Sequence, residues 1–200
     1  MSDKRSDRDG TTRGGDERVQ RTKHAVLAAT YKLMWEGGIG GVSIDEVARR
    51  SGVAKTSIYR HWPTRAALLL DACSRLGTTP EIPDTGTLKG DLAVLARRLA
   101  EQLRTARWPA MLPSIIDAAE RDEDIAGMHA KLQAGFSSPY IPVVERAIAR
   151  GELPARQNPA EIIAVVLGPL FFRRWFSREP LDETFVKSVV ARALLTPRKR

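Results

Sequence analysis

The chain has 200 residues, of which 42% are hydrophobic, so it can bury one full core or two small ones. Its formal net charge of +8 favours a polyanionic partner, although basic side chains also aid solubility. A single cysteine, Cys73, excludes an internal disulfide and a cysteine-rich metal site. We expect Cys73 to be a small buried hydrophobe rather than a redox sensor.

The start of the chain has no apolar segment of the kind found in secretory signals. The longest apolar stretch, residues 162–172, is shorter than the roughly 20 residues that span a bilayer. We therefore expect a cytoplasmic protein that does not enter a membrane.

Residues 1–16 are rich in charged residues and glycine and show no apolar periodicity, so we predict a disordered arm there. Its basic side chains could contact DNA, or the arm could be a plain solvated tail. Apolar residues at helical spacing, among them Val19, Val26 and Leu33, then predict a first helix over residues 17–36.

Residues 43–62 predict two short helices joined by a tight turn, the geometry of a helix-turn-helix unit. Ser43 can cap the first of them and Glu46 can reach back, which makes a capping box. Gly52 supplies the left-handed backbone that ends this helix. Once Val53 and Ile58 are buried, the second helix leaves phosphate-binding and base-binding side chains exposed. These are Lys55, Thr56, Ser57, Tyr59, Arg60 and His61.

About a quarter of the chain, from Arg18 to Cys73, resembles the DNA-binding domain of the TetR (tetracycline-repressor-like) family. The resemblance rests on Ser43-Ile-Asp-Glu-Val-Ala, Ser51-Gly-Val, and Ile58-Tyr-Arg-His-Trp followed by Arg65. Ala54, Thr56 and Trp62 depart from the residues usual in that family. The pattern predicts that Thr56, Ser57, Tyr59 and His61 lie nearest the DNA groove, and that Ser43, Lys55, Arg60 and Arg65 hold phosphates.

The remaining elements are all predicted helices. A fourth helix over residues 66–76 completes a DNA-binding domain at 17–77, and the proline- and glycine-containing residues 78–86 form a linker. A second domain, residues 87–196, holds helices at 87–105, 110–120, 122–150, 159–177 and 182–195. The segment 122–150 is either one kinked helix or two. We expect an all-α protein of about nine helices, ending in a basic tail at 197–200.

The helix over residues 160–176 is apolar on nearly every side, so we expect part of it to face a second chain. Together with the last helix it would form a four-helix interface, which is how TetR-like proteins dimerise; the alternative is a monomer. A two-fold dimer would match a palindromic operator in double-stranded DNA. The predicted interface residues are Ile163, Val166, Leu167, Leu170, Val186, Val189, Val190 and Ala193.

The resemblance also implies a pocket for a small-molecule effector in the second domain. Aromatic side chains and methionines can line a pocket for an apolar compound, although each of them could equally be core. The candidates are Trp108, Met111, Ile115, Met128, Phe136, Tyr140, Phe171 and Trp175.

No spacing of histidines, cysteines or glycines indicates a catalytic, metal or cofactor site, so we expect no enzyme. The sequence therefore predicts a homodimeric, ligand-responsive transcriptional regulator, a repressor released from its operator by an effector. The alternative is a non-specific architectural DNA-binding protein, which would not require a ligand-sized second domain.

Overall fold

The computed structural model describes residues 10–74 and 81–195, with side chains from residue 16 onward. Within these ranges the chain forms ten α-helices and three shorter helical segments, and no strand. This confirms the predicted all-helical fold, with one α-helix more than expected. Predictions for residues 1–9, 75–80 and 197–200 lie outside the described residues.

Contacts divide the chain into two compact units, which differ from the predicted domains. The first unit contains the described residues before 77 together with Ala110–His129, and the second contains Gly77–Pro109 together with the residues from Ala130 onward. The sequence-based boundary placed every residue from 87 to 196 in one domain. Residues 110–129 instead pack with the N-terminal helices.

The first helix, α1, spans Gly10–Gly37 and is longer than predicted. The helix thus includes residues 10–16, which we expected to belong to a disordered arm. Extending an existing helix gains a backbone hydrogen bond per residue without needing apolar contacts, so a polar stretch can continue it. Val19, expected on the buried face, is 39% exposed, whereas Val26 and Leu33 are buried.

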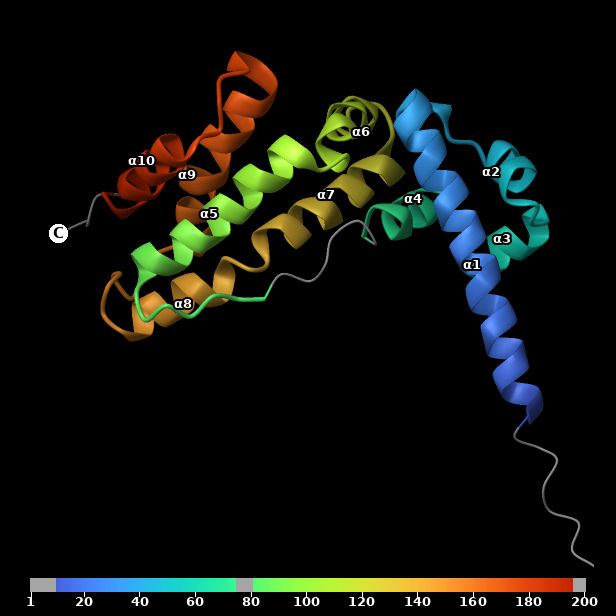
Figure 1. Cartoon of the computed structure of the whole chain (residues 1–200), viewed down its shortest axis with the longest axis horizontal. Coiled ribbons are helices and arrows are strands. Elements are labelled where there is room, and N and C mark those ends of the chain that lie inside the picture. Colours follow the sequence, from blue (N-terminus) through green and yellow to red (C-terminus); the bar gives the residue numbers. More distant parts are fainter. Residues whose placement is uncertain (1–9, 75–80, 196–200) are drawn as a thin grey trace, which may run out of the picture. The chain divides into compact units, whose positions relative to one another are not determined.

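Short helices surround α1 in the first unit. α2 (Ile44–Ser51) and α4 (Arg65–Ser74) both pack on α1, and α3 (Lys55–His61) packs on α2 (Figure 1). The link between α1 and α2 is the 3-10 turn η1 (Ile39–Gly41), which contacts α6 (Leu112–Ala119). There the Ser114 hydroxyl accepts a hydrogen bond from the Ile39 amide at 3.2 Å.

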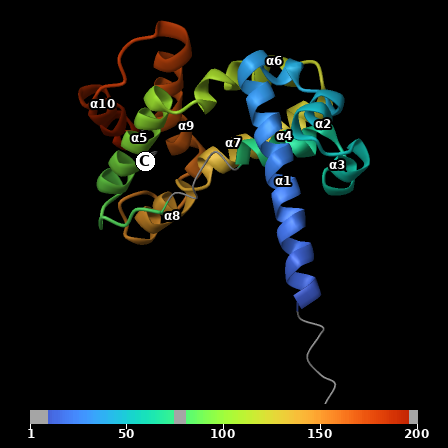
Figure 2. The same cartoon turned by 45° about the vertical axis from the view of Figure 1, so that its right-hand side comes forward.

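The second unit is a bundle around α5 (Leu88–Thr105). α8 (Ile141–Ala149), α9 (Pro159–Phe172) and α10 (Glu183–Leu194) all pack on α5, as the two views in Figures 1 and 2 show. α7 (Glu123–Ser137) ends before α8 begins, so the segment expected to be one or two helices is two. Pro142 lies in the first turn of α8, where its missing amide hydrogen loses no helical bond.

α9 continues into a five-residue π-helical segment, η3 (Arg173–Ser177), at the place where the sequence predicted a single helix through 177. Arg178, in the left-handed region at φ 55°, ends this segment. Between residues 10 and 195, apart from 75–80, no helix is both long and apolar enough to cross a bilayer.

Candidate DNA-binding interface

α2 begins as its sequence predicts. Ser43 is the N-cap, and its hydroxyl accepts a hydrogen bond from the Glu46 amide at 3.1 Å. Glu46 does not complete the expected capping box, because its carboxylate binds Arg49 and Arg50 on the following turn, with Nε–Oε distances of 2.8 Å to each. The hydrogen bonds from Arg49 and Arg50 lower the pKa of Glu46 to about 2.

The turn between α2 and α3 also follows from the sequence. Gly52 adopts φ 69°, in the left-handed region, and its amide donates to the Ala48 carbonyl at 3.0 Å. Ala54 is the N-cap of α3, and because alanine has no polar side chain, α3 begins without a side-chain cap. Ile58 is fully buried, but Val53, which we expected to be buried, is half-buried.

The outward side of α3 carries the residues expected to meet DNA. Lys55, Thr56, Tyr59 and Arg60 are exposed, and Ser57 and His61 are half-buried. We call these six residues the α3 surface. Lys55 and Tyr59 are four residues apart, which places them on one side of the helix. α3 contains no acidic residue, so the surface suits a polyanion.

Two of the basic residues predicted to bind phosphate have partners within the protein. Lys55 Nζ lies 2.5 Å from Asp45 Oδ1, so the first turns of α2 and α3 are joined by an ion pair. Arg65 is half-buried, and its guanidinium donates to the Val42 carbonyl at 2.7 Å and to the Ile39 carbonyl. Arg65 thus stabilises the link between α1 and α2.

Three acidic residues around this interface were not predicted from the sequence. Asp45 pairs with Lys55, Glu36 lies 2.5 Å from Arg50, and Asp71 accepts a hydrogen bond from the indole of Trp62 at 2.9 Å. Each pair joins residues nine or more positions apart on different elements. Helical spacing therefore gave no signal for them.

Five of the predicted pocket residues belong to the second unit, and four of these form a chain of aromatic rings. Ring centroids are 4.8 Å apart for Trp108 and Phe136, 6.4 Å for Phe136 and Phe171, and 5.1 Å for Phe171 and Trp175. The Trp175 indole donates to the Pro109 carbonyl at 3.1 Å. We call Trp108, Phe136, Phe171 and Trp175 the aromatic cluster.

The other pocket candidates lie elsewhere. Tyr140 is buried in the core of the second unit, and this burial raises the pKa of its hydroxyl above the usual value. Met111, Ile115 and Met128 are buried in the first unit. The predicted pocket set is therefore divided between the two units.

The eight residues predicted for the dimer interface are buried inside the protomer, each 6% exposed or less. α9 packs against α5, α8 and α10, so its predicted interface residues are covered without a second chain. The exposed aromatic residues here are different ones: Phe172 and Phe176, 57% and 77% exposed, which stack with centroids 5.6 Å apart.

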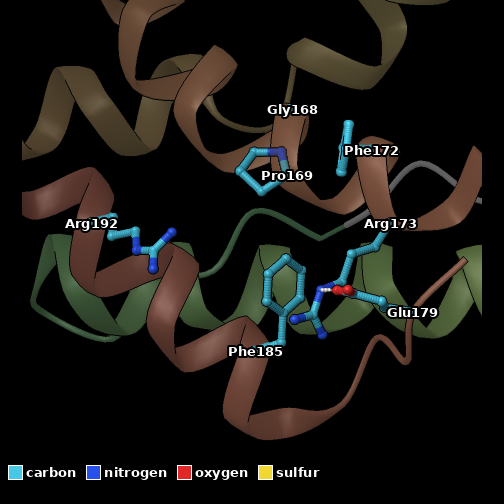
Figure 3. A pocket seen from close by; sticks show the side chains of 7 residues that line it. All are labelled: Gly168, Pro169, Phe172, Arg173, Glu179, Phe185 and Arg192. Atoms are coloured by element: carbon cyan, nitrogen blue, oxygen red, sulfur yellow. Dashed lines mark ion pairs between the residues drawn. The ribbon is translucent and has the colours of Figure 1, made fainter. Parts of the chain in front are cut away.

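Beside this aromatic pair, α9 and α10 border an open groove of about 530 Å³ (Figure 3). The guanidinium of Arg173 lies 3.5 Å from the ring centroid of Phe185 and pairs with Glu179 at 3.0 Å. The lining residues are Gly168, Pro169, Phe172, Arg173, Glu179, Phe185 and Arg192.

Neither metal binding nor thiol chemistry is indicated by the side chains that the structure describes. Among them, no group of three or more His, Cys, Asp or Glu could hold a metal ion. Cys73 is half-buried, and desolvation raises the pKa of its thiol to about 11, which disfavours the reactive thiolate.

Two family models match the chain, one in each half. The model described as "Bacterial regulatory proteins, tetR family" matches residues 26–72, which include α2 and α3. The model described as "Tetracyclin repressor-like, C-terminal domain" matches residues 82–193. The matches include most of the described helices.

Individual proteins are similar over nearly the whole chain. The HTH-type transcriptional regulator YdeS of Bacillus subtilis is 30% identical over 186 residues, covering 90% of this chain and 91% of its own. The DNA-binding transcriptional repressor TetR of Mycobacteroides abscessus is 30% identical, with coverages of 86% and 90%. The crystal structure of the TetR family transcription regulator SCO0332 aligns with a TM-score of 0.68 at 27% identity, covering 88% of this chain and 98% of its own.

The Ser43 cap of α2, the Gly52 turn and the basic outer side of α3 form a helix-turn-helix unit, and family models of TetR regulators match both halves of the chain. This chain belongs to the TetR family of helix-turn-helix transcriptional regulators.

Proposed function

We propose that this DNA-binding regulator is a homodimeric repressor that inserts α3 into the major groove of a palindromic operator and leaves it when an effector binds. The α3 surface is the observation that carries the proposal. It presents two cations and a half-exposed tyrosine on a helix without acidic residues. In this arrangement Tyr59 and its neighbours would read base edges, while Lys55 and Arg60 would hold phosphates.

Exposed aromatic surface supports the homodimer. Phe172 and Phe176 lie side by side in contact with solvent, next to a groove between α9 and α10. Contiguous exposed apolar surface on a folded unit is typical of a protein interface. The interface would therefore use the outer sides of α9 and α10 rather than the buried residues that periodicity suggested.

The aromatic cluster supports an apolar effector. Its four rings follow one another in contact within the second unit, and the Trp175 indole donates a hydrogen bond to the Pro109 carbonyl. Binding would release the operator if the effector favours a dimer whose α3 helices are wrongly spaced, because only differential affinity shifts an equilibrium.

Selection of bound duplexes from a random pool tests the proposal. We expect enrichment of one palindrome whose half-sites lie about one DNA turn apart. A non-specific architectural protein would enrich no sequence, and its affinity would follow salt concentration alone. A selected sequence without two-fold symmetry would contradict the dimer.

No catalytic reaction is part of this proposal. The family to which the chain belongs consists of transcriptional regulators. Since transcription in bacteria takes place in the cytoplasm, the proposed function implies a cytoplasmic protein.

A further inference from the structure

The ion pair between Asp45 and Lys55 lies at the edge of the α3 surface. Lys55 is the first residue of α3 and Asp45 the second residue of α2, and their charged atoms are 2.5 Å apart. Both side chains remain accessible, with exposed fractions of 53% for Lys55 and 72% for Asp45. A DNA phosphate that reaches Lys55 therefore meets an ammonium group to which a carboxylate is already bound.

A carboxylate and a phosphate compete for the same positive charge. Lys55 carries one positive charge, and both partners bind it through anionic oxygens. If Lys55 moves to a phosphate, it leaves Asp45 unpaired close to the negative backbone of DNA. The second cation of the α3 surface, Arg60, has no acidic partner among residues 16–74.

We propose that Asp45 is an internal competitor of DNA for Lys55 and so limits the affinity and the salt dependence of DNA binding. This inference rests on the proposed role of the α3 surface. It assigns a function to an acidic residue that lies outside α3 and that would itself make no favourable contact with DNA.

Removing the competitor has two expected effects. Replacing Asp45 by asparagine tightens DNA binding about two- to five-fold, the range of an exposed ion pair. It also steepens the dependence of log affinity on log salt concentration by up to about 0.9 for each Lys55–phosphate contact. In the unaltered chain, Asp45 takes up a cation from the solution when Lys55 moves to a phosphate, and this uptake offsets part of the release of cations from DNA. In Asp45→Asn no such uptake takes place. Both effects arise on any DNA sequence.

The test measures binding to one fluorescein-labelled duplex of mixed sequence by anisotropy over a series of salt concentrations. The full chain is compared with Asp45→Asn, Lys55→Met and the double variant. Asp124→Asn is the matched control, since Asp124 is also an exposed aspartate at the second position of a helix. Thermal unfolding of each variant verifies that the fold is kept.

The expected result is tighter, more salt-dependent binding by Asp45→Asn, no change for Asp124→Asn, and no gain from Asp45→Asn once Lys55 is methionine. An equal gain in both backgrounds would overturn the inference, because it would show long-range repulsion instead of competition. Unchanged affinity of Asp45→Asn would overturn it as well. Failure of the unaltered chain to bind any duplex would contradict the proposed function itself, and this inference with it.

Discussion

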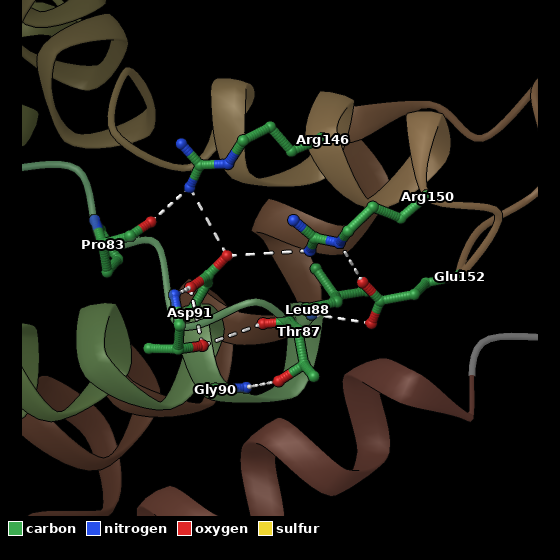
Figure 4. Close-up of polar contacts among 9 residues, drawn as sticks. Pro83, Thr87, Leu88, Gly90, Asp91, Arg146, Arg150 and Glu152 are labelled. Carbon is green, nitrogen blue, oxygen red and sulfur yellow. Dashed lines mark hydrogen bonds and ion pairs between the residues drawn. The ribbon is translucent and has the colours of Figure 1, made fainter.

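The buried carboxylate of Asp91 lies 3.5 Å from the guanidinium of Arg146, on a different helix of the second unit (Figure 4). Asp91 also accepts hydrogen bonds from the amide and the hydroxyl of Thr85, at 2.7 and 2.9 Å. Arg146 in turn donates to the Pro83 carbonyl. One acidic side chain thus ties residues 83–85, which precede α5, to α5 and α8.

Asp91→Ala should lower the free energy of unfolding by about 2–3 kcal/mol, because it leaves the Thr85 amide unpaired and deprives Arg146 of its acid. The expected loss is below that of a fully buried pair, since Arg146 is 32% exposed and remains partly hydrated. Urea unfolding measures the change. The exposed Glu101→Ala serves as a control and should change the free energy by less than about 1 kcal/mol. Equal effects of the two substitutions would contradict the assignment.

Substitutions of two neighbouring residues of α3 should affect different properties, one the stability of the fold and the other DNA binding. Ile58→Ala should destabilise the protein by about 2–5 kcal/mol, because the side chain is fully buried. Tyr59→Ala should leave stability nearly unchanged and weaken operator binding about tenfold, since Tyr59 is 50% exposed. Circular dichroism melting and anisotropy with the selected operator measure the two quantities. Loss of helical signal in Tyr59→Ala would instead place this side chain in the core.

Substitutions of Arg65 and Arg60 should distinguish an arginine that stabilises the fold from one that binds DNA. Arg65→Ala should cost about 1–3 kcal/mol of stability, because the Val42 and Ile39 carbonyls between α1 and α2 each lose a charged donor. Arg60→Ala should leave the melting temperature unchanged and lower the salt slope of DNA binding by about one. A reduced salt slope with unchanged stability for Arg65→Ala would favour the phosphate role predicted from the sequence.

Charge placed on the exposed aromatic pair should prevent dimer formation. Phe172→Glu together with Phe176→Glu introduces two carboxylates into the proposed interface, where they would be buried without partners. Sedimentation velocity should show a monomer. Ile141→Glu is a matched control, since Ile141 is an exposed apolar residue of the same unit, 40% exposed on α8, and this variant should stay dimeric. A dimer that survives both phenylalanine substitutions would mean that the chains meet elsewhere.

The stability of the first unit should fall at acid pH in a way that depends on Glu46. The folded-state pKa of Glu46, about 2, lies below its ordinary value of 4.5 because of Arg49 and Arg50. A group whose pKa is lowered by folding stabilises the protein above its unfolded pKa, and this contribution is lost as pH falls from about 4.5 toward 2. Melting temperatures of Glu46→Gln should therefore vary less with pH over this range than those of the unaltered chain. Identical pH profiles would contradict the lowered pKa.

Local sequence determined the helix-turn-helix unit. Ser43 as a cap, Gly52 at the turn and Ile58 as the buried residue of α3 act over a few positions, and each occupies its predicted place. Helix capping, left-handed turns and the helical period depend on neighbours in the chain, so a pattern of residue types suffices to predict them.

Tertiary structure decided which apolar and charged residues meet. The periodicity of α9 indicated an excess of apolar surface, but only the packing of α9 on α5, α8 and α10 shows that Val166 and Leu170 are covered within the chain while Phe172 is not. The partners of Lys55 and Arg65 likewise come from other elements. A helical pattern specifies which residues share a face, and the partner of that face depends on how distant segments pack.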